Sequence, residues 1–431
     1  MRFFMMVAVF WTATGAASTW AQDQNPMQPR FQNLPSLQEA KVGNKTYPDW
    51  LRDLNAVDPA VKEAAMQALI VYGSQPSYVK EVRKDVGPAI IRILNDPSTT
   101  DVSIKVNGAL VLGTIGLDEK DMDSGVSCLL RLLPDNESVV RLYATTALAN
   151  FGSDERAPVQ SLARKAIPSL ARMMVRDKAS WEIRRAAVAG LSRLAWDRTV
   201  KEGGPDPQAF RTLTEAVRDR CLQVRQEAAK GFIYIGPPVI SSDPKKPGST
   251  KDDLYRAVEA LDGLTMQRDK STSILGHWAT LAIDPPKLNN PQEVDKHLRA
   301  ICRLMSKQNE TQVRMDASYS LTGIWELVNS KRVANHPDPK TFNAKTSWGE
   351  VIHTATLNLE DKDETIICWA CSVLGTMGPA AEKAIKDLEK LKARLANRDS
   401  TNLTKRMVEW ALAKCHGKEA SQVGAANRTG P

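Results

Sequence analysis

One amphipathic pattern recurs along the chain at a nearly constant spacing. Its clearest copy, VRLYATTALANFG, runs from Val140 to Gly152 and places apolar residues at i, i+4, i+7, i+8 and i+11. This spacing forms a single stripe on an α-helix. The copies align on the position of Leu148, which recurs every ~43 residues on average. The aligned residues are Leu69, Leu112, Leu148, Leu191, Phe232, Leu281, Leu321, Leu374 and Leu412.

A second amphipathic segment precedes most of these copies, for example GPAIIRIL from Gly87 and AIPSLARMM from Ala166. Each unit is therefore predicted to consist of helix A, a short turn and helix B. One such pair cannot bury its apolar face alone, whereas stacked pairs share a continuous core. The pattern predicts an all-α solenoid of about nine helical pairs.

The turn between the two helices has a recurring charge pattern. An acidic residue in the turn is followed by an aliphatic residue and then by a base. The acids are Asp58, Asp101, Glu137, Glu310 and Asp363, and the bases are Lys62, Lys105, Arg141, Arg184, Arg225, Arg314 and Lys405. Prolines in or before helix A, Pro88 and Pro168, complete the pattern.

These features resemble the armadillo-like HEAT-repeat family over roughly residues 50 to 417. The resemblance implies a right-handed superhelix of helical pairs. It also implies that the acid and base positions form a ladder of hydrogen bonds that ties each turn to the next unit. The base is missing at Ile274 and Ile367, so the pattern is weaker in the sixth and eighth units.

The first residues have the three parts of a secretory signal. Arg2 is followed by the apolar run Phe3–Trp11 and then by small residues that lead to Ala21. Nine apolar residues are far fewer than the roughly 20 that span a bilayer. We therefore expect cleavage after Ala21 and export to the periplasm, the cell envelope or the medium, as in exported bacterial-type HEAT-repeat proteins. No transmembrane segment is expected after cleavage.

The predicted domains follow from these boundaries. They are a signal peptide at 1–21, a flexible linker or loosely docked arm at 22–46, the solenoid at 47–417 and a disordered tail at 418–431. The unit spacing is longest after the fifth and seventh units, where segments rich in Pro, Lys, Ser and Asn begin at Pro237 and Glu326. We expect both segments to be exposed loops.

The six cysteines offer one candidate for chemistry. Cys368-Trp369-Ala370-Cys371 has CxxC spacing near the predicted start of a helix, where the dipole lowers a thiol pKa. The pair could be redox-active, could form a local disulfide or could simply pack. A thioredoxin-like site needs a βαβ context, which this helical repeat does not supply. We therefore expect buried thiols at Cys128, Cys302, Cys371 and Cys415.

The histidines predict no metal site and no cofactor. None of the five is followed by Glu, so the repeated His-Glu pairs that bind two irons in HEAT-like hydroxylases are missing. HExxH and His pairs at helical spacing are also missing. His277 and His353 are expected to be partly buried core positions. The chain is accordingly predicted not to be an enzyme; a thiol oxidoreductase using Cys368 and Cys371, or a HEAT-like lyase, is the alternative.

Basic residues are concentrated in the fourth unit. Eleven Lys and Arg residues lie against three acids between Arg156 and Lys201. Arg184, Arg185 and Arg193 on the predicted helix B are candidate ligand-binding residues, whereas Lys165, Arg172 and Arg176 belong to helix A. A basic groove can bind a polyanion. Export makes nucleic acid unlikely as the partner, which leaves an anionic envelope polymer or a solvated surface.

The sequence therefore predicts an exported, non-catalytic HEAT-repeat scaffold that mediates protein–protein interaction. It does not name the protein partner. The alternative function is polyanion binding through the basic fourth repeat.

Overall fold

The computed structural model describes residues 36–154, 156–175, 180–197, 204–238, 240, 249–329, 346–396 and 401–417. Helices dominate these ranges, and the only strands there are β1 (Lys41–Val42) and β2 (Lys45–Thr46), which form an antiparallel hairpin. The predicted signal peptide, residues 22–35, most of both predicted loops and the tail at 418–431 lie outside the described residues.

The helices of the first five units follow the predicted order of A, turn and B. The pairs are α1 (Tyr47–Asp53) with α2 (Pro59–Gly73), α3 (Val79–Asn95) with α4 (Val102–Ile115), α5 (Glu119–Leu132) with α6 (Ser138–Phe151), α7 (Ala157–Ala163), η2 (Arg164–Ala166) and α8 (Ile167–Val175) with α9 (Trp181–Leu194), and α10 (Pro207–Ala216) with α11 (Leu222–Ile235).

Four further pairs complete the described part of the chain. They are α12 (Lys251–Thr265) with α13 (Lys270–Ile283), α14 (Pro285–Leu288) and α15 (Pro291–Leu304) with α16 (Thr311–Asn329), α18 (Trp348–Asn358) with α19 (Glu364–Met377), and η3 (Gly378–Ala384) and α20 (Ile385–Ala396) with α21 (Asn402–Cys415).

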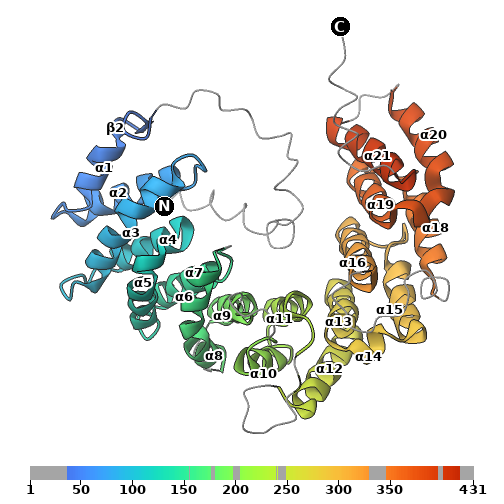
Figure 1. Cartoon of the computed structure of the whole chain (residues 1–431), viewed down its shortest axis with the longest axis horizontal. Helices are drawn as coiled ribbons and strands as arrows, with labels where there is room; N and C mark the ends of the chain where they lie inside the picture. Colours follow the sequence, from blue (N-terminus) through green and yellow to red (C-terminus); the bar gives the residue numbers. More distant parts are fainter. Residues whose placement is uncertain are drawn as a thin grey trace.

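The pairs stack into a curved array (Figure 1). The B helices, from α2 and α4 to α19 and α21, line its inner side, and the A helices lie outside them. Each B helix packs on the B helix of the next unit. This is an armadillo- or HEAT-like α-solenoid, and the predicted fold class is confirmed.

The aligned apolar positions form the interior of the array. All nine residues used for the alignment are buried, and the most exposed of them, Leu412, retains only 9% of its surface. The clearest unit, Val140–Gly152, buries Leu148 completely. Repeat spacing and helical periodicity were therefore sufficient to locate the core.

The alignment was wrong by one residue in the sixth unit. Elsewhere the aligned residue lies eleven positions after the residue that caps helix B, whereas Leu281 lies twelve positions after the cap Asp269. The equivalent residue is Thr280, which is also fully buried. Ser273 then takes the place of the base, and its hydroxyl donates to the Thr265 carbonyl at 2.7 Å.

Three of the five acids of the sequence pattern cap helices and do not form the ladder, and Glu137 makes no cap hydrogen bond with its side chain. Asp101 accepts hydrogen bonds from the backbone N–H groups of Ser103 and Ile104, and Asp58 and Asp363 accept equivalent bonds at the starts of α2 and α19. Such caps satisfy N–H groups that have no partner within the helix. The carboxylate that ties two units together must therefore come from another residue of the turn.

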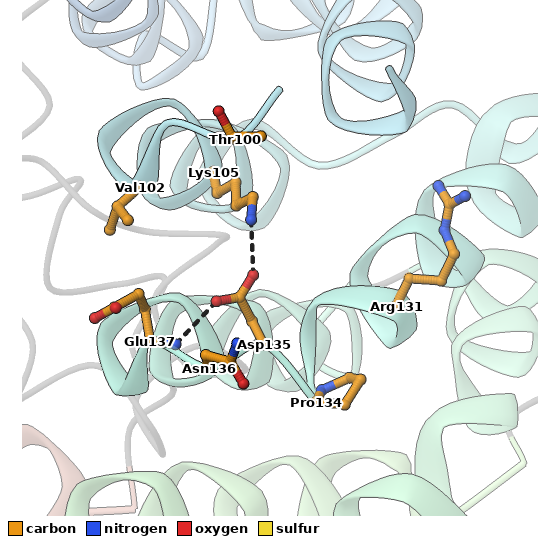
Figure 2. Close-up of a pocket in the computed structure, with 8 residues that line it drawn as sticks. All are labelled: Thr100, Val102, Lys105, Arg131, Pro134, Asp135, Asn136 and Glu137. Atoms are coloured by element: carbon orange, nitrogen blue, oxygen red, sulfur yellow. Dashed lines mark hydrogen bonds and ion pairs between the residues drawn. The ribbon is translucent and has the colours of Figure 1, made fainter. Parts of the chain in front are cut away.

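That carboxylate lies two residues before the cap, and it accepts from the base of the preceding unit. We call each such contact a rung. The rungs are Lys105–Asp135 at 2.9 Å, Arg184–Asp219 at 2.8 Å and Arg314–Asp361 at 2.7 Å. Figure 2 shows the first of them, with Asp135 also accepting from the backbone N–H of Glu137.

The same turn is bonded from its own unit as well. Arg141 donates to the Asp135 carbonyl at 2.7 Å, and Arg225 donates to the Asp219 carbonyl at 2.8 Å. Each of these turns therefore receives one base from the preceding helix B and one from its own. This arrangement couples neighbouring units, as the implied ladder required, but through different acids.

The packed structure starts before the predicted solenoid boundary at Tyr47. Residues 36–46 form a turn and the β1–β2 hairpin, and Leu37 is 4% exposed. The Tyr72 hydroxyl donates to the Ala40 carbonyl at 2.8 Å, and the Trp50 indole donates to the Val42 carbonyl at 3.1 Å. This part of the predicted linker is thus docked on the first unit.

Close helix contact predicts opposite effects for two glycine substitutions. A Cβ atom at Gly113 of α4 would lie 2.7 Å from the Ala147 Cα atom of α6, whereas a Cβ at Gly263 of α12 would meet nothing within 4 Å. Gly113→Ala should lower the free energy of unfolding by about 1–3 kcal/mol, because the helices must move apart. Gly263→Ala should raise it by about 0.5–1 kcal/mol through helix propensity. Urea denaturation of both variants tests this, and equal effects would contradict the packing.

Candidate functional site

Arg184 is a structural residue and not an available ligand-binding residue. Its guanidinium contacts both carboxylate oxygens of Asp219, at 2.8 and 3.0 Å. The two side chains are only 6% and 7% exposed. A bidentate, buried pair of this kind keeps the guanidinium away from an anion in solvent. The sequence analysis grouped Arg184 with Arg185 and Arg193, and the structure places it in a buried pair between two units.

Acids from neighbouring units pair with many bases of the fourth unit. The ion pairs are Arg156–Asp154 at 2.7 Å, Arg164–Asp206 at 3.6 Å, Lys165–Asp123 and Arg185–Glu227 at 3.3 Å. Arg193 donates to the Asn150 side chain at 3.2 Å, and Arg172 donates to Ser169 at 3.0 Å. Arg176, Lys178, Arg198 and Lys201 lie outside the described residues. The described bases therefore do not form a strip of uncompensated charge.

Arg185 and Arg193 do lie on the inner helix α9, as predicted, whereas Lys165 and Arg172 belong to the outer helices η2 and α8 (Figure 1). Arg185 remains 41% exposed in its pair with Glu227. These two arginines can thus contact a ligand on the inner face, but each already has a partner. Polyanion binding through them remains a prediction.

The CxxC thiols are arranged for packing. All six cysteines are free, and the four thiols predicted to be buried are buried. Burial raises the pKa of Cys371 strongly and that of Cys368 to a lesser degree. Burial also raises the pKa of Cys415 to about 11. Redox-active thiols need a lowered pKa, so the geometry favours packing over the redox hypothesis for Cys368 and Cys371.

Two histidines that are distant in sequence meet between α13 and α15. The Nδ1 atoms of His277 and His297 lie 2.8 Å apart, and their rings meet edge to face. His297 is 2% exposed, and its Nε2 atom has no hydrogen-bond partner among the described residues. His353, predicted to be partly buried with His277, is exposed on α18. No cluster of three or more His, Cys, Asp or Glu suited to a metal is found in the part of the chain that the structure describes.

Figure 2 shows a polar hollow of about 400 Å³ between the turns of the second and third units. Its central groups, Lys105 and Asp135, form the first rung, and its exposed rim includes Arg131 and Glu137. Because Lys105 and Asp135 neutralise each other, the hollow offers no activated nucleophile or base. It is a gap between successive turns.

An aromatic row follows four successive B helices in the C-terminal half. It consists of Trp278 on α13, Tyr319 on α16, Trp369 on α19 and Trp410 on α21. Trp278 and Tyr319 meet edge to face with ring centroids 5.4 Å apart, and Tyr319 and Trp369 do so at 5.8 Å. No pattern in the sequence predicts this row, because its members come together only once the units are stacked.

Three members of the aromatic row, Tyr319, Trp369 and Trp410, are partly exposed toward the inner face of the array, whereas Trp278 is buried. Tyr319 is 37% exposed, and Trp369 and Trp410 are half-buried. A B helix contacts helix A behind it and other B helices on its flanks, so its remaining exposed side is the inner one (Figure 1). Burial raises the pKa of Tyr319, and Glu326 adds to the effect. The Tyr319 hydroxyl therefore stays protonated and can donate a hydrogen bond.

Neither protein-family models nor curated proteins match this chain. Similar solved structures include an engineered protein with 17% identity and a TM-score of 0.44, aligned over 89% of this chain and 91% of that one. A computationally designed armadillo repeat protein for modular peptide recognition has 18% identity and a TM-score of 0.42, over 55% and 100%. A designed armadillo repeat protein in complex with the peptide (KR)4 has 18% identity and a TM-score of 0.44, over 56% and 100%. At these TM-scores nothing about the ligand of this chain follows.

None of the helices in the described ranges combines the length and the apolar character needed to cross a bilayer.

Proposed function

We propose that this chain is an exported, non-catalytic scaffold that binds a protein partner on the inner face of its solenoid. The observation that carries the proposal is the aromatic row of Trp278, Tyr319, Trp369 and Trp410. Tyr and Trp are enriched in protein interfaces, where they supply large contact areas and hydrogen-bond donors. The partly exposed members of the row, Tyr319, Trp369 and Trp410, lie on three successive units and offer a surface to an elongated partner.

The geometry of the row also supports binding over a purely structural role. The indole of Trp278 packs against the backbone at Gly323, and that of Trp410 against Gly375, so each ring is held in place by the neighbouring helix. Tyr319 lies between Trp278 and Trp369 and remains the most exposed of the three. Rigid aromatic side chains of this kind lose little conformational entropy when they bind.

The binding surface is tested by removing its centre. Tyr319→Ala combined with Trp369→Ala should weaken partner capture at least about 30-fold, since truncation of interface hot spots costs 2 kcal/mol or more. The measurement is affinity capture from the cell envelope of the source organism, followed by quantitative mass spectrometry. Tyr255→Ala is the control, because Tyr255 is 69% exposed on the outer helix α12. Circular dichroism first checks that both variants are folded. If the Tyr319→Ala/Trp369→Ala variant then captures as much partner as the wild type, the assignment of the binding surface to the inner face is refuted.

Export is supported by the residues at the start of the chain. Arg2, the apolar run Phe3–Trp11 and the small residues before Ala21 have the order of a cleavable signal. The mature protein should therefore begin at Gln22 and be recovered outside the cytoplasm. N-terminal sequencing of material from cell fractions tests this, and exported protein that still begins at Met1 would contradict it.

A further inference from the structure

The stack of outer helices is interrupted between the sixth and seventh units. Outer helices pack directly in the earlier units, for example α3 on α5 and α10 on α12. Direct packing of α12 on α15 is not found among the principal helix contacts of the described residues, and the short helix α14 lies between α13 and α15 instead. The apolar core also divides here, because Ala279 and Ile283 of α13 join the preceding cluster and Ile274, Trp278 and Leu281 join the following one.

Polar contacts connect the two sides of this junction. His277 of α13 meets His297 of α15 at 2.8 Å, and Lys287 of α14 forms an ion pair with Asp262 of α12 at 3.0 Å. Apolar side chains also cross this junction, because Ile274, Trp278 and Leu281 of α13 share a core cluster with residues of α15 and α16. Its outer part, where α14 replaces a direct contact between α12 and α15, joins through titratable groups. Its strength therefore depends on their protonation states.

The histidine contact needs a neutral accepting ring. One Nδ1–H group donates to the lone pair of the other Nδ1, so a proton on the accepting ring places two N–H groups face to face. The Nε2 atom of buried His297 has no partner among the described residues that would stabilise a charge. A metal ion does not suit the pair either, because a ligating histidine needs an acceptor for its other ring nitrogen.

The surroundings of the two rings also disfavour their protonation. Burial, and then Lys296, lower the pKa of His277 to about 4, against the opposing effect of Asp262. Burial, His277, Lys287 and Lys296 lower the pKa of His297 to about 3. Asp284 caps α14 beside Lys287, and no charge from α11, α16 or α18 in the described part of the chain acts on either ring.

We propose that the His277–His297 contact is a pH-sensitive joint at which the solenoid opens between its sixth and seventh units in an acidic environment. The free energy that keeps the joint closed is fully present above pH ~6.5, the ordinary pKa of histidine, and is lost as the pH falls toward 4. The joint adjoins Trp278, which follows His277 in α13 and contacts Tyr319 of α16. Opening would therefore separate the first member of the aromatic row from the second.

Hydrogen exchange of the full chain at pH 7 and pH 5 tests the joint without any partner. After correction for the intrinsic exchange rates, protection in α13 and α15 should fall by roughly two orders of magnitude, because two groups with lowered pKa take up protons on opening. Protection in α4 and α6 should change little in the same sample. Retained protection in α13 and α15, or an equal loss along the whole chain, would overturn the proposal.

Variants sharpen this comparison. His277→Gln/His297→Gln replaces the pair with amides that still form hydrogen bonds but do not titrate, so the difference between pH 7 and pH 5 in α13 and α15 should disappear. His353→Gln makes the same change at an exposed position and should leave the wild-type difference intact. A difference that persists in the double variant would exclude the histidines as its cause. If the double variant does not fold, the wild-type chain still tests the proposal, because the loss of protection in α13 and α15 can be compared with that in α4 and α6. Loss of partner binding by the Tyr319 and Trp369 variant is a separate result, so the joint and the proposed function can fail independently.

Discussion

Asp219→Ala is expected to lower the free energy of unfolding by about 3–5 kcal/mol, the range found when one partner of a buried ion pair is removed. The substitution leaves the Arg184 guanidinium buried at 6% exposure without its bidentate acceptor. It also removes the oxygen that accepts from the Cys221 backbone N–H at 2.7 Å. Urea denaturation followed by circular dichroism measures the loss.

Two matched variants separate the rung from charge effects in general. Glu259→Ala breaks the exposed pair with Arg218, whose side chains are 45% and 63% exposed, and should cost less than about 1 kcal/mol. Arg184→Met/Asp219→Leu removes both charges and should be markedly more stable than Asp219→Ala, because no unpaired charge remains. If Asp219→Ala were as mild as Glu259→Ala, the rung would not be a main connection between units.

Leu148→Ala is expected to destabilise the third unit by about 2–5 kcal/mol through lost burial and a residual cavity. Leu148 is fully buried in α6, which packs on α4, α5 and α9. Since a solenoid is coupled mainly between neighbours, hydrogen exchange should show the largest loss of protection between about residues 120 and 195. Leu357→Ala removes the same atoms from a side chain that is 49% exposed and is the control. Unchanged protection in that range would contradict the packing.

The repeat in the sequence predicted the fold because it encodes the packing of each unit. Spacing of apolar residues located helix B and its buried side, and the nine aligned positions are all buried. The register failed only in α13, where Leu281 follows Thr280 and both are fully buried. When a polar residue such as Thr280 occupies the repeat position and an apolar residue follows it, the apolar pattern selects the wrong one of the two buried positions. The cap at Asp269 resolves the register, since cap geometry counts from the helix start.

The charge pattern of the sequence does not show which acid of each turn accepts from the base of the preceding unit. Asp101 and Asp135 lie in equivalent turns, two positions apart in register, yet the first caps a helix and the second accepts from Lys105. Sequence spacing places both acids in the turn but does not show which carboxylate faces the preceding unit. Three-dimensional packing decides this, so the ladder was predicted and its acids were not.

The candidate site depended on contacts between units, which a linear reading does not contain. The charge of the basic segment was counted against the acids between Arg156 and Lys201 only. In the structure Arg184 pairs with Asp219 and Arg185 with Glu227, which lie 35 and 42 residues away. His277 and His297 are 20 residues apart on different helices. Trp278, Tyr319 and Trp410 are the ninth residues of their helices, but Trp369 is only the sixth residue of α19, so the row becomes visible only in the stacked structure.

Site-specific photocrosslinking tests most directly whether the partner binds to the inner face. A photoreactive phenylalanine analogue is placed at Tyr319 on α16 or at Tyr255 on α12 in the otherwise wild-type chain, and the living cells are irradiated. The account predicts a crosslinked protein from position 319 that is lost when Trp369→Ala is added, and none from position 255. A crosslinked product from position 255, with none from position 319, would contradict the account.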